Sequence, residues 1–109
     1  MNQKCWFMGT WQVEVRDAID VCTKAVELGG KAEYLDSRAM VYYRNGMFEE
    51  ALADLDAALD RKPEMNGSLL LRGVILREMG DAAGQKDIDA ALARDPMLAS
   101  SYGLFGFEF

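Results

Sequence analysis

The stretch that decides the fold is DLDAALDRKP at residues 54–63, because it returns almost unchanged as DIDAALARDP at residues 87–96. The second copy begins 33 residues after the first. A match of this length at this spacing is typical of repeat proteins, in which one supersecondary unit stacks on the next. The sequence therefore predicts a repeat architecture.

Chain-breaking residues mark nearly the same period. Pro63 and Pro96 stand 33 residues apart, and Gly46 and Gly80 stand 34 apart. Glycine is typical of a tight turn, and proline of the end of a helix. We therefore predict that each glycine joins two helices and that each proline follows the second helix of a pair.

Apolar residues between these marks recur at the three- and four-residue spacing of amphipathic helices. The second helix of each pair also carries two small residues, two turns apart, that let a neighbouring helix approach closely. These are Ala18 and Ala25, Ala51 and Ala58, and Gly84 and Ala91. Gly84 is expected to cost its helix up to about 1 kcal/mol relative to alanine. We predict one all-α domain over residues 1–109, with three helix pairs at about residues 1–30, 31–64 and 65–97.

Residues 98–109 form a C-terminal segment after the third pair. We predict a short helix before Gly103 and then a tail that is too apolar to lie in water, through Leu104, Phe105 and Phe107. Two arrangements remain open. In one, Leu98, Tyr102 and Phe105 cover the open end of the last helix pair. In the other, this end meets a partner or a second copy.

Composition limits the classes of partner. Half of the 109 residues are hydrophobic, which is enough to bury a core, and the net charge of −6 has the wrong sign for binding phosphates. We therefore predict no nucleic-acid partner. The chain has no apolar run of the roughly 18 residues that a membrane span needs, and its start, MNQKCWFMG, lacks the features of a signal peptide. As written it is expected to be cytoplasmic, or periplasmic if an upstream export signal has been removed.

The sequence offers little for catalysis. It contains no histidine, and the carboxylates at residues 49–60 are spread over the polar side of an amphipathic helix. The tail GLFGFEF has two glycines three apart but no basic residue, so it is a weak match to a phosphate loop. Two cysteines without histidine do not furnish a closed metal site. We predict no enzyme activity, no cofactor and no metal.

The second unit carries a family pattern over residues 32–65: Tyr42, Gly46, Phe48, Ala51, Leu55, Ala58 and Pro63. In this order the residues resemble the tetratricopeptide repeat. The third unit keeps part of the pattern, while the first has Gly29 and Gly30 where the others have proline. The resemblance implies a right-handed α-solenoid of helix-turn-helix units with a short C-terminal helix. More narrowly, the chain is similar to tetratricopeptide proteins of proteobacteria.

Helix pairing predicts which side chains face each other. In an antiparallel hairpin, residues at equal distances from the turn lie opposite, so their numbers average to the turn position. Arg38 and Asp54 average to 46, and Arg72 and Asp87 to 79.5, at the two turn glycines. We predict a charge-assisted bond in each pair, with a structural role.

Cys5 and Cys22 average to 13.5, in the predicted turn of the first unit. Two alternatives remain open for them. In an oxidising compartment they form a disulfide, which stabilises the fold by about 3 kcal/mol in the chain-entropy model. In the cytoplasm they stay reduced and pack as small apolar side chains. The first alternative also allows a scaffold whose stability responds to redox conditions.

The resemblance implies a concave surface built from the first helix of each unit. The residues placed there are Gln3, Phe7, Asp36, Met40, Tyr43, Arg44, Leu70, Val74 and Arg77. An apolar stripe of this kind, with charges at its edges, suits an amphipathic helix or an extended peptide. The lysine and asparagine clamp of some family members is not matched, because Asp36 and Met40 take the places of the central unit. The groove is either open or partly filled by a segment of the protein outside this sequence or by a second copy.

The function predicted is therefore a non-enzymatic interaction module that binds a protein or peptide in the concave groove. The alternative is a self-associating scaffold, in which the apolar end around Phe105 and Phe107 builds a homodimer.

Overall fold

The computed structural model describes residues 2–109, and every regular element in that range is a helix. The helices are α1 (Asn2–Thr10), α2 (Val15–Gly29), α3 (Ala32–Arg44), α4 (Phe48–Arg61), α5 (Asn66–Glu78), α6 (Ala83–Arg94) and α7 (Leu98–Gly103). The all-α prediction is confirmed.

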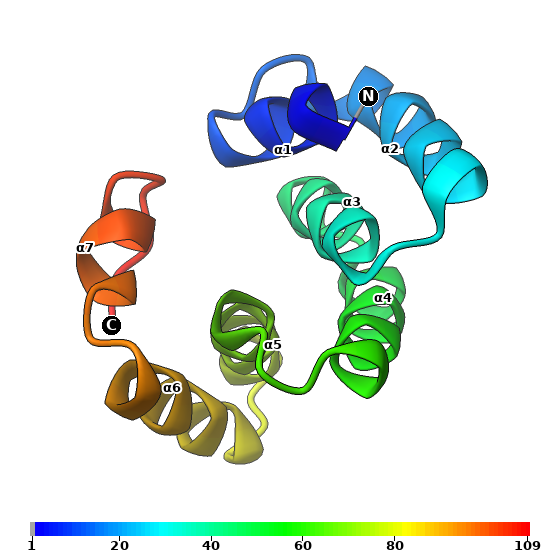
Figure 1. The fold of residues 1–109 in the computed structure, drawn as a ribbon. Coiled ribbons are helices and arrows are strands. Elements are labelled where there is room, and N and C mark those ends of the chain that lie inside the picture. The colour runs from blue at the N-terminus through cyan, green and yellow to red at the C-terminus, as the bar shows by residue number, and fades with distance from the viewer. Residues whose placement is uncertain (1) are drawn as a thin grey trace.

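The first six helices form three consecutive antiparallel pairs. Figure 1 shows them as a C-shaped arc, with α1, α3 and α5 on its inner side and α2, α4 and α6 on its outer side. The short helix α7 stands across the hollow from α3 and α5. The fold is thus an α-solenoid of helix-turn-helix repeats whose inner side faces its own last helix.

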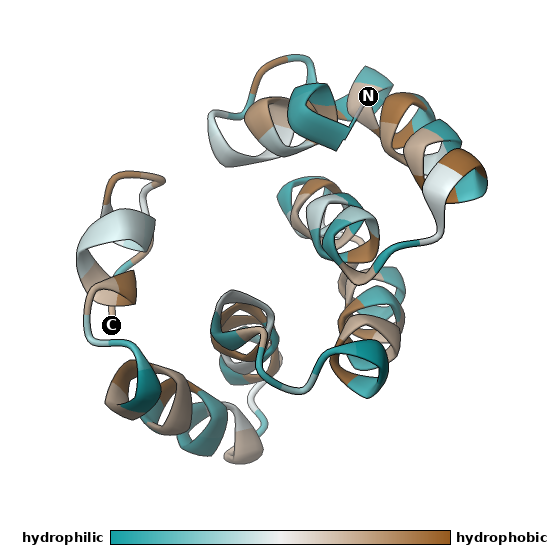
Figure 2. Cartoon of the chain, viewed as in Figure 1, coloured by the Kyte–Doolittle hydropathy of each residue, from teal (hydrophilic) through white to brown (hydrophobic). Residues whose placement is uncertain are grey.

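Hydrophobic and hydrophilic residues alternate along each long helix, as Figure 2 shows. The apolar side chains pack inward, and the main core runs through the second and third pairs. Its fully buried members include Ala39, Ala51, Leu55, Leu71, Ile75, Ile88 and Ala91. This core explains the helical spacing of the sequence, because burial of one apolar face per helix drives the stacking.

Gly46 and Gly80 form the predicted turns. Their φ angles are 75° and 83°, in the left-handed region that disfavours residues with a Cβ. A Cβ at either position would meet no atom within 4 Å. The glycines are therefore required by the backbone conformation of the turn and not by lack of space.

Gly84 is explained by the packing of α5 against α6. A Cβ on Gly84 would lie 2.4 Å from the carbonyl oxygen of Gly73, and one on Gly73 would lie 2.6 Å from that of Gly84. The corresponding residues of the second pair are Ala39 and Ala51, both fully buried. The two glycines bring the third pair's backbones into direct contact, which offsets the helix propensity that Gly84 gives up.

The predicted facing pairs lie together in all three hairpins. Arg38 donates two hydrogen bonds to Asp54, at 2.7 and 2.8 Å. Arg72 donates two to Asp87, at 2.8 and 3.2 Å. In the first hairpin, Cys5 and Cys22 form a disulfide with their Cα atoms 5.0 Å apart.

Candidate functional site

The inner face of the arc holds most of the residues predicted to line a groove, and four of these residues are buried. Met40 and Leu70 are fully buried, Val74 is 3 % exposed, and Asp36 is 8 % exposed. Met40, Leu70 and Val74 share one apolar core with Tyr102 and Phe107 of the C-terminal segment. The expectation of an open apolar stripe is therefore corrected: the groove exists, and the C-terminal segment fills it.

Tyr102 of α7 fixes this segment in the groove. It is only 5 % exposed and belongs to the same apolar core as Met40 and Leu70. A Cβ on Gly67 of α5 would lie 2.6 Å from the Tyr102 hydroxyl, so the glycine leaves the room that this side chain occupies. Leu98 and Phe105 pack against the same core, which includes Ile88 and Ala91 of α6, as the first of the two predicted arrangements has it.

Phe107 is the deepest residue of the tail. It is 8 % exposed, its ring stacks on Tyr43 with 5.6 Å between centroids, and the Arg44 guanidinium lies 4.8 Å from its centroid. Both wall residues come from α3. The apolar C-terminal end proposed as a dimer surface is thus partly buried within the same chain, while Leu104 remains 73 % exposed.

Two arginines hold the main chain of the tail. Arg44 Nη2 donates to the carbonyl oxygen of Phe105 at 2.7 Å, and Arg77 Nη2 donates to that of Glu108 at 2.9 Å. Arg44 also donates to the carbonyl oxygens of Gly9 and Thr10 in the last turn of α1. The groove charges predicted from the sequence therefore bind backbone carbonyls of the protein itself.

A cavity of about 270 Å³ remains beside the tail. Its walls are Tyr43, Val74, Arg77 and Glu78 on the helix side, and residues 106–108 of the tail. Tyr43 Oη donates to Glu78 Oε1 at 3.1 Å. Burial, with Glu78 as the next cause, raises the pKa of Tyr43 to about 12, so this hydroxyl stays protonated at neutral pH.

Phe7 does not join the aromatic cluster at the tail, which corrects the predicted stripe. Its side chain is 53 % exposed, whereas Trp6 packs against the core and lies 5.9 Å from Phe105 between ring centroids. Trp11 lies 5.3 Å from Phe105 in the same way. Because the disulfide turns Cys5 toward α2, Trp6 faces the tail and Phe7 does not. That constraint was readable in the cysteine pair.

Asp36 lies at the base of the filled groove. Ser68 Oγ of α5 donates to Asp36 Oδ1 at 2.6 Å, a partner that the sequence did not indicate. Burial raises the pKa of Asp36 to about 6, against the lowering effect of the Ser68 hydrogen bond and with a small raising effect of Glu33. Burial also raises the pKa of Tyr102, with the Asp36 charge as a second cause.

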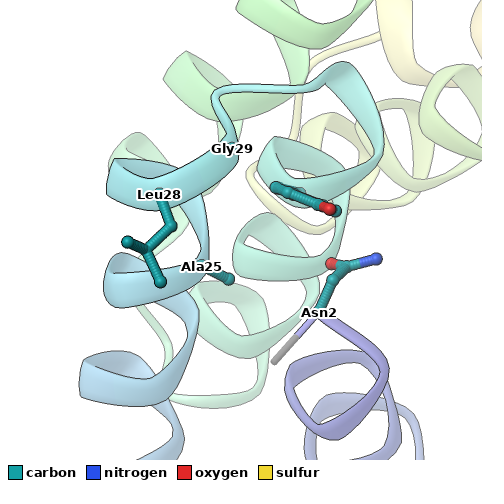
Figure 3. Close-up of a pocket in the computed structure, with 5 residues that line it drawn as sticks. Asn2, Ala25, Leu28 and Gly29 are labelled. Atoms are coloured by element: carbon teal, nitrogen blue, oxygen red, sulfur yellow. The ribbon is translucent and has the colours of Figure 1, made fainter.

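A second hollow, of about 170 Å³, lies between the start of α1 and the end of α2. Figure 3 shows Ala25 and Leu28 on one wall and Asn2 on another. Leu28 is 76 % exposed, and no charged side chain lines the hollow. It therefore offers little for recognition. In the described range 2–109, no cluster of acidic or cysteine side chains has the grouping that a metal ion needs.

The family comparison agrees with the geometry of the second helix pair. Residues 32–65, which hold α3 and α4, match the family model of the tetratricopeptide repeat. The match covers the second helix pair, so over this stretch the chain resembles the tetratricopeptide repeat family. Such repeats are non-enzymatic modules that generally mediate protein–protein interactions and bind proteins or peptides. Comparison with curated proteins and with solved structures found no match. Over the part of the chain that is described, no helix has the length and apolar character to cross a membrane.

Proposed function

We propose that this protein is a protein-interaction module that binds a short peptide segment of a partner in the concave groove between α3 and α5. The observation that carries the proposal is the occupancy of that groove by residues 104–109, which are held as a bound peptide is held. One aromatic side chain is buried, and arginines bind the flanking carbonyl oxygens.

The alternative of a homodimer through Phe105 and Phe107 has less support. Phe107 is 8 % exposed, so its side chain contributes little apolar surface to a second copy. The remaining exposed apolar residues of the tail, Leu104 and Phe109, are 73 % and 42 % exposed. A pair of separated side chains is ordinary for a protein surface and does not by itself indicate an interface.

A peptide library selected against the full chain tests this function. Selected peptides are expected to lose at least fivefold in affinity on the variant Arg77→Ala, because the charge-assisted bond to a backbone carbonyl is lost. Arg94→Ala is the matched control, since Arg94 is an exposed arginine of α6 on the outer side. Arg77 is itself exposed, so both variants are expected to fold. Recovery of no peptide, or of peptides that bind both variants equally, would overturn the proposal.

A further inference from the structure

We infer that residues 104–109 are an intramolecular occupant of the peptide site, and that the partner segment that replaces them is non-helical, as they are, and carries one aromatic side chain at the place of Phe107. The inference rests on the proposed function and names the class of ligand. It also assigns the tail a role, because a site that holds its own chain binds a partner only when the tail leaves.

The aromatic requirement follows from the walls of the Phe107 site. Tyr43 stacks on the Phe107 ring with 28° between the two ring planes. The Arg44 guanidinium carbon lies 4.8 Å from the centroid of the Phe107 ring. An aromatic ring in contact with both a ring and a cation gains more than an aliphatic side chain of equal area. Tyr43 and Arg44 belong to α3, so they remain in place when the tail leaves.

The register of the segment follows from the main-chain contacts. Arg44 binds the carbonyl oxygen two residues before Phe107, and Arg77 binds the one that follows Phe107. Contacts to carbonyl oxygens do not depend on the side chain of the residue that bears them. They therefore fix the register of a segment around its aromatic residue while leaving its other positions free.

Within the described residues, the backbone N–H groups of the tail make no bonds to the groove, which favours exchange. They bond only locally: those of Phe105 and Phe107 donate to Tyr102, and that of Gly106 to Gly103. Leu104 and Glu108 are exposed, and the cavity of about 270 Å³ beside Phe107 is left unfilled. A partner segment that fills this cavity gains contacts that the tail does not make.

Competition by the tail sets the size of the expected effect. A segment tethered at the site has an effective concentration of the order of millimolar, so the measured affinity for a separate peptide falls by the fraction of molecules in which the site is free. A variant that loosens the tail should therefore bind a separate peptide more tightly than the wild type does.

The experiment uses the full chain and a synthetic peptide of residues 103–109, GLFGFEF, with blocked ends and a fluorescent label. Affinity is measured by fluorescence anisotropy for the wild type, Phe107→Ala and Leu104→Ala. Phe107→Ala is expected to bind the peptide at least tenfold more tightly than the wild type. Leu104→Ala, a change at an exposed apolar residue of the same tail, is expected to bind as the wild type does. A peptide with alanine in place of Phe107 is expected not to bind.

A folded Phe107→Ala chain that fails to bind GLFGFEF, or that binds both peptides equally, overturns the inference. Circular dichroism and a melting curve establish that the variant is folded. If Phe107→Ala is unfolded, Phe107→Leu replaces it, because leucine keeps an apolar side chain but removes the ring contacts; the same order of affinities is expected, and its absence has the same meaning. If the library yields groove peptides but the GLFGFEF measurement fails, only the inferred ligand class is refuted. Failure of both experiments refutes the proposed function as well.

Discussion

The first and second helix pairs place a cross-link at the same height of the hairpin and build it from different chemistry. Cys5 and Cys22 are joined covalently, whereas Arg38 and Asp54 share two hydrogen bonds between charged groups. Cys5 precedes Arg38 by 33 residues and Cys22 precedes Asp54 by 32, so the disulfide stands where the repeat has its ion pair.

The difference matches the quality of the two hairpins. The second pair turns at a glycine, and its sequence matches the family over residues 32–65. The first pair turns through Gln12 and Glu14, whose φ angles of 56° and 47° are strained for residues with a Cβ. The covalent link lies in the hairpin whose turn is less favourable, where a constraint on the unfolded chain contributes most to the fold.

The largest expected effect is therefore loss of the disulfide. Its 17-residue separation predicts that reduction, or the double change Cys5→Ala and Cys22→Ala, lowers the free energy of unfolding by about 3 kcal/mol. Urea denaturation with and without reductant measures this. The double variant is the control, since reductant should not change it further. An unchanged free energy of unfolding on reduction would show that the first hairpin does not depend on the disulfide.

The next effect concerns the ion pair of the second hairpin. Asp54→Ala leaves the Arg38 guanidinium, which is 19 % exposed, without its partner. We expect the free energy of unfolding to fall by about 2–3 kcal/mol, with no dependence on reductant. Asp60→Ala is the matched control, because Asp60 is an exposed carboxylate of the same helix. Equal small losses for both variants would mean that the pair contributes no more than a surface ion pair.

These pairs were predictable because turn symmetry is a local property of the sequence. Arg38 and Asp54 lie 16 residues apart around a glycine, and the same relation recurs in the third unit. The filling of the groove was not predictable in this way. Phe107 and Tyr43 are related by no repeat, so only the three-dimensional path of the chain brings their rings together.

The rotation of α1 was also beyond the family pattern. One residue along a helix is about 100° of rotation, so the exchange of Phe7 for Trp6 reflects a small error in register. The register is set by the disulfide, which turns Cys5 toward α2, so the cysteine pair and not the family pattern carries this information.

A third prediction concerns a hydrogen bond between two hairpins, in contrast to the cross-links within a hairpin. Asp36 of the second pair accepts a hydrogen bond from Ser68 of the third and lies near Glu33 and Tyr102. Its pKa is about 6 in the folded protein, above its ordinary 3.8, so the folded state binds the proton more tightly than the unfolded state. This tighter proton binding stabilises the folded state. The stabilisation is fully present below pH 3.8 and is lost as pH rises through 6.

The variant Asp36→Asn removes this proton linkage. We expect it to raise the free energy of unfolding by about 1–2 kcal/mol at pH 7.5 and to leave it unchanged or lower at pH 4.5, since the buried charge is absent only at low pH in the wild type. Urea denaturation across pH 4.5–7.5 measures the two curves. Parallel curves for the variant and the wild type would contradict the assignment. Glu49→Gln is a suitable control because Glu49 is an exposed carboxylate of α4.

The smallest effect is expected at the third hairpin, whose ion pair repeats the second with one addition. Arg72 bonds Asp87 and also donates to Asp56 Oδ1 of the neighbouring hairpin at 3.1 Å. Asp87→Ala therefore leaves Arg72 with a partner, and its side chain, at 29 % exposed, is better hydrated than that of Arg38. We expect a loss of only about 1 kcal/mol.

A double-mutant cycle separates the two partners of Arg72. If Asp56 compensates for the missing Asp87, the combined variant Asp56→Ala with Asp87→Ala loses more stability than the sum of the single variants, by about 0.5 kcal/mol or more. Additive losses would mean that Asp56, whose side chain is 62 % exposed, contributes the same with or without Asp87 and does not compensate for its loss. In that case the smaller loss for Asp87→Ala than for Asp54→Ala would have to come from the better hydration of Arg72 alone.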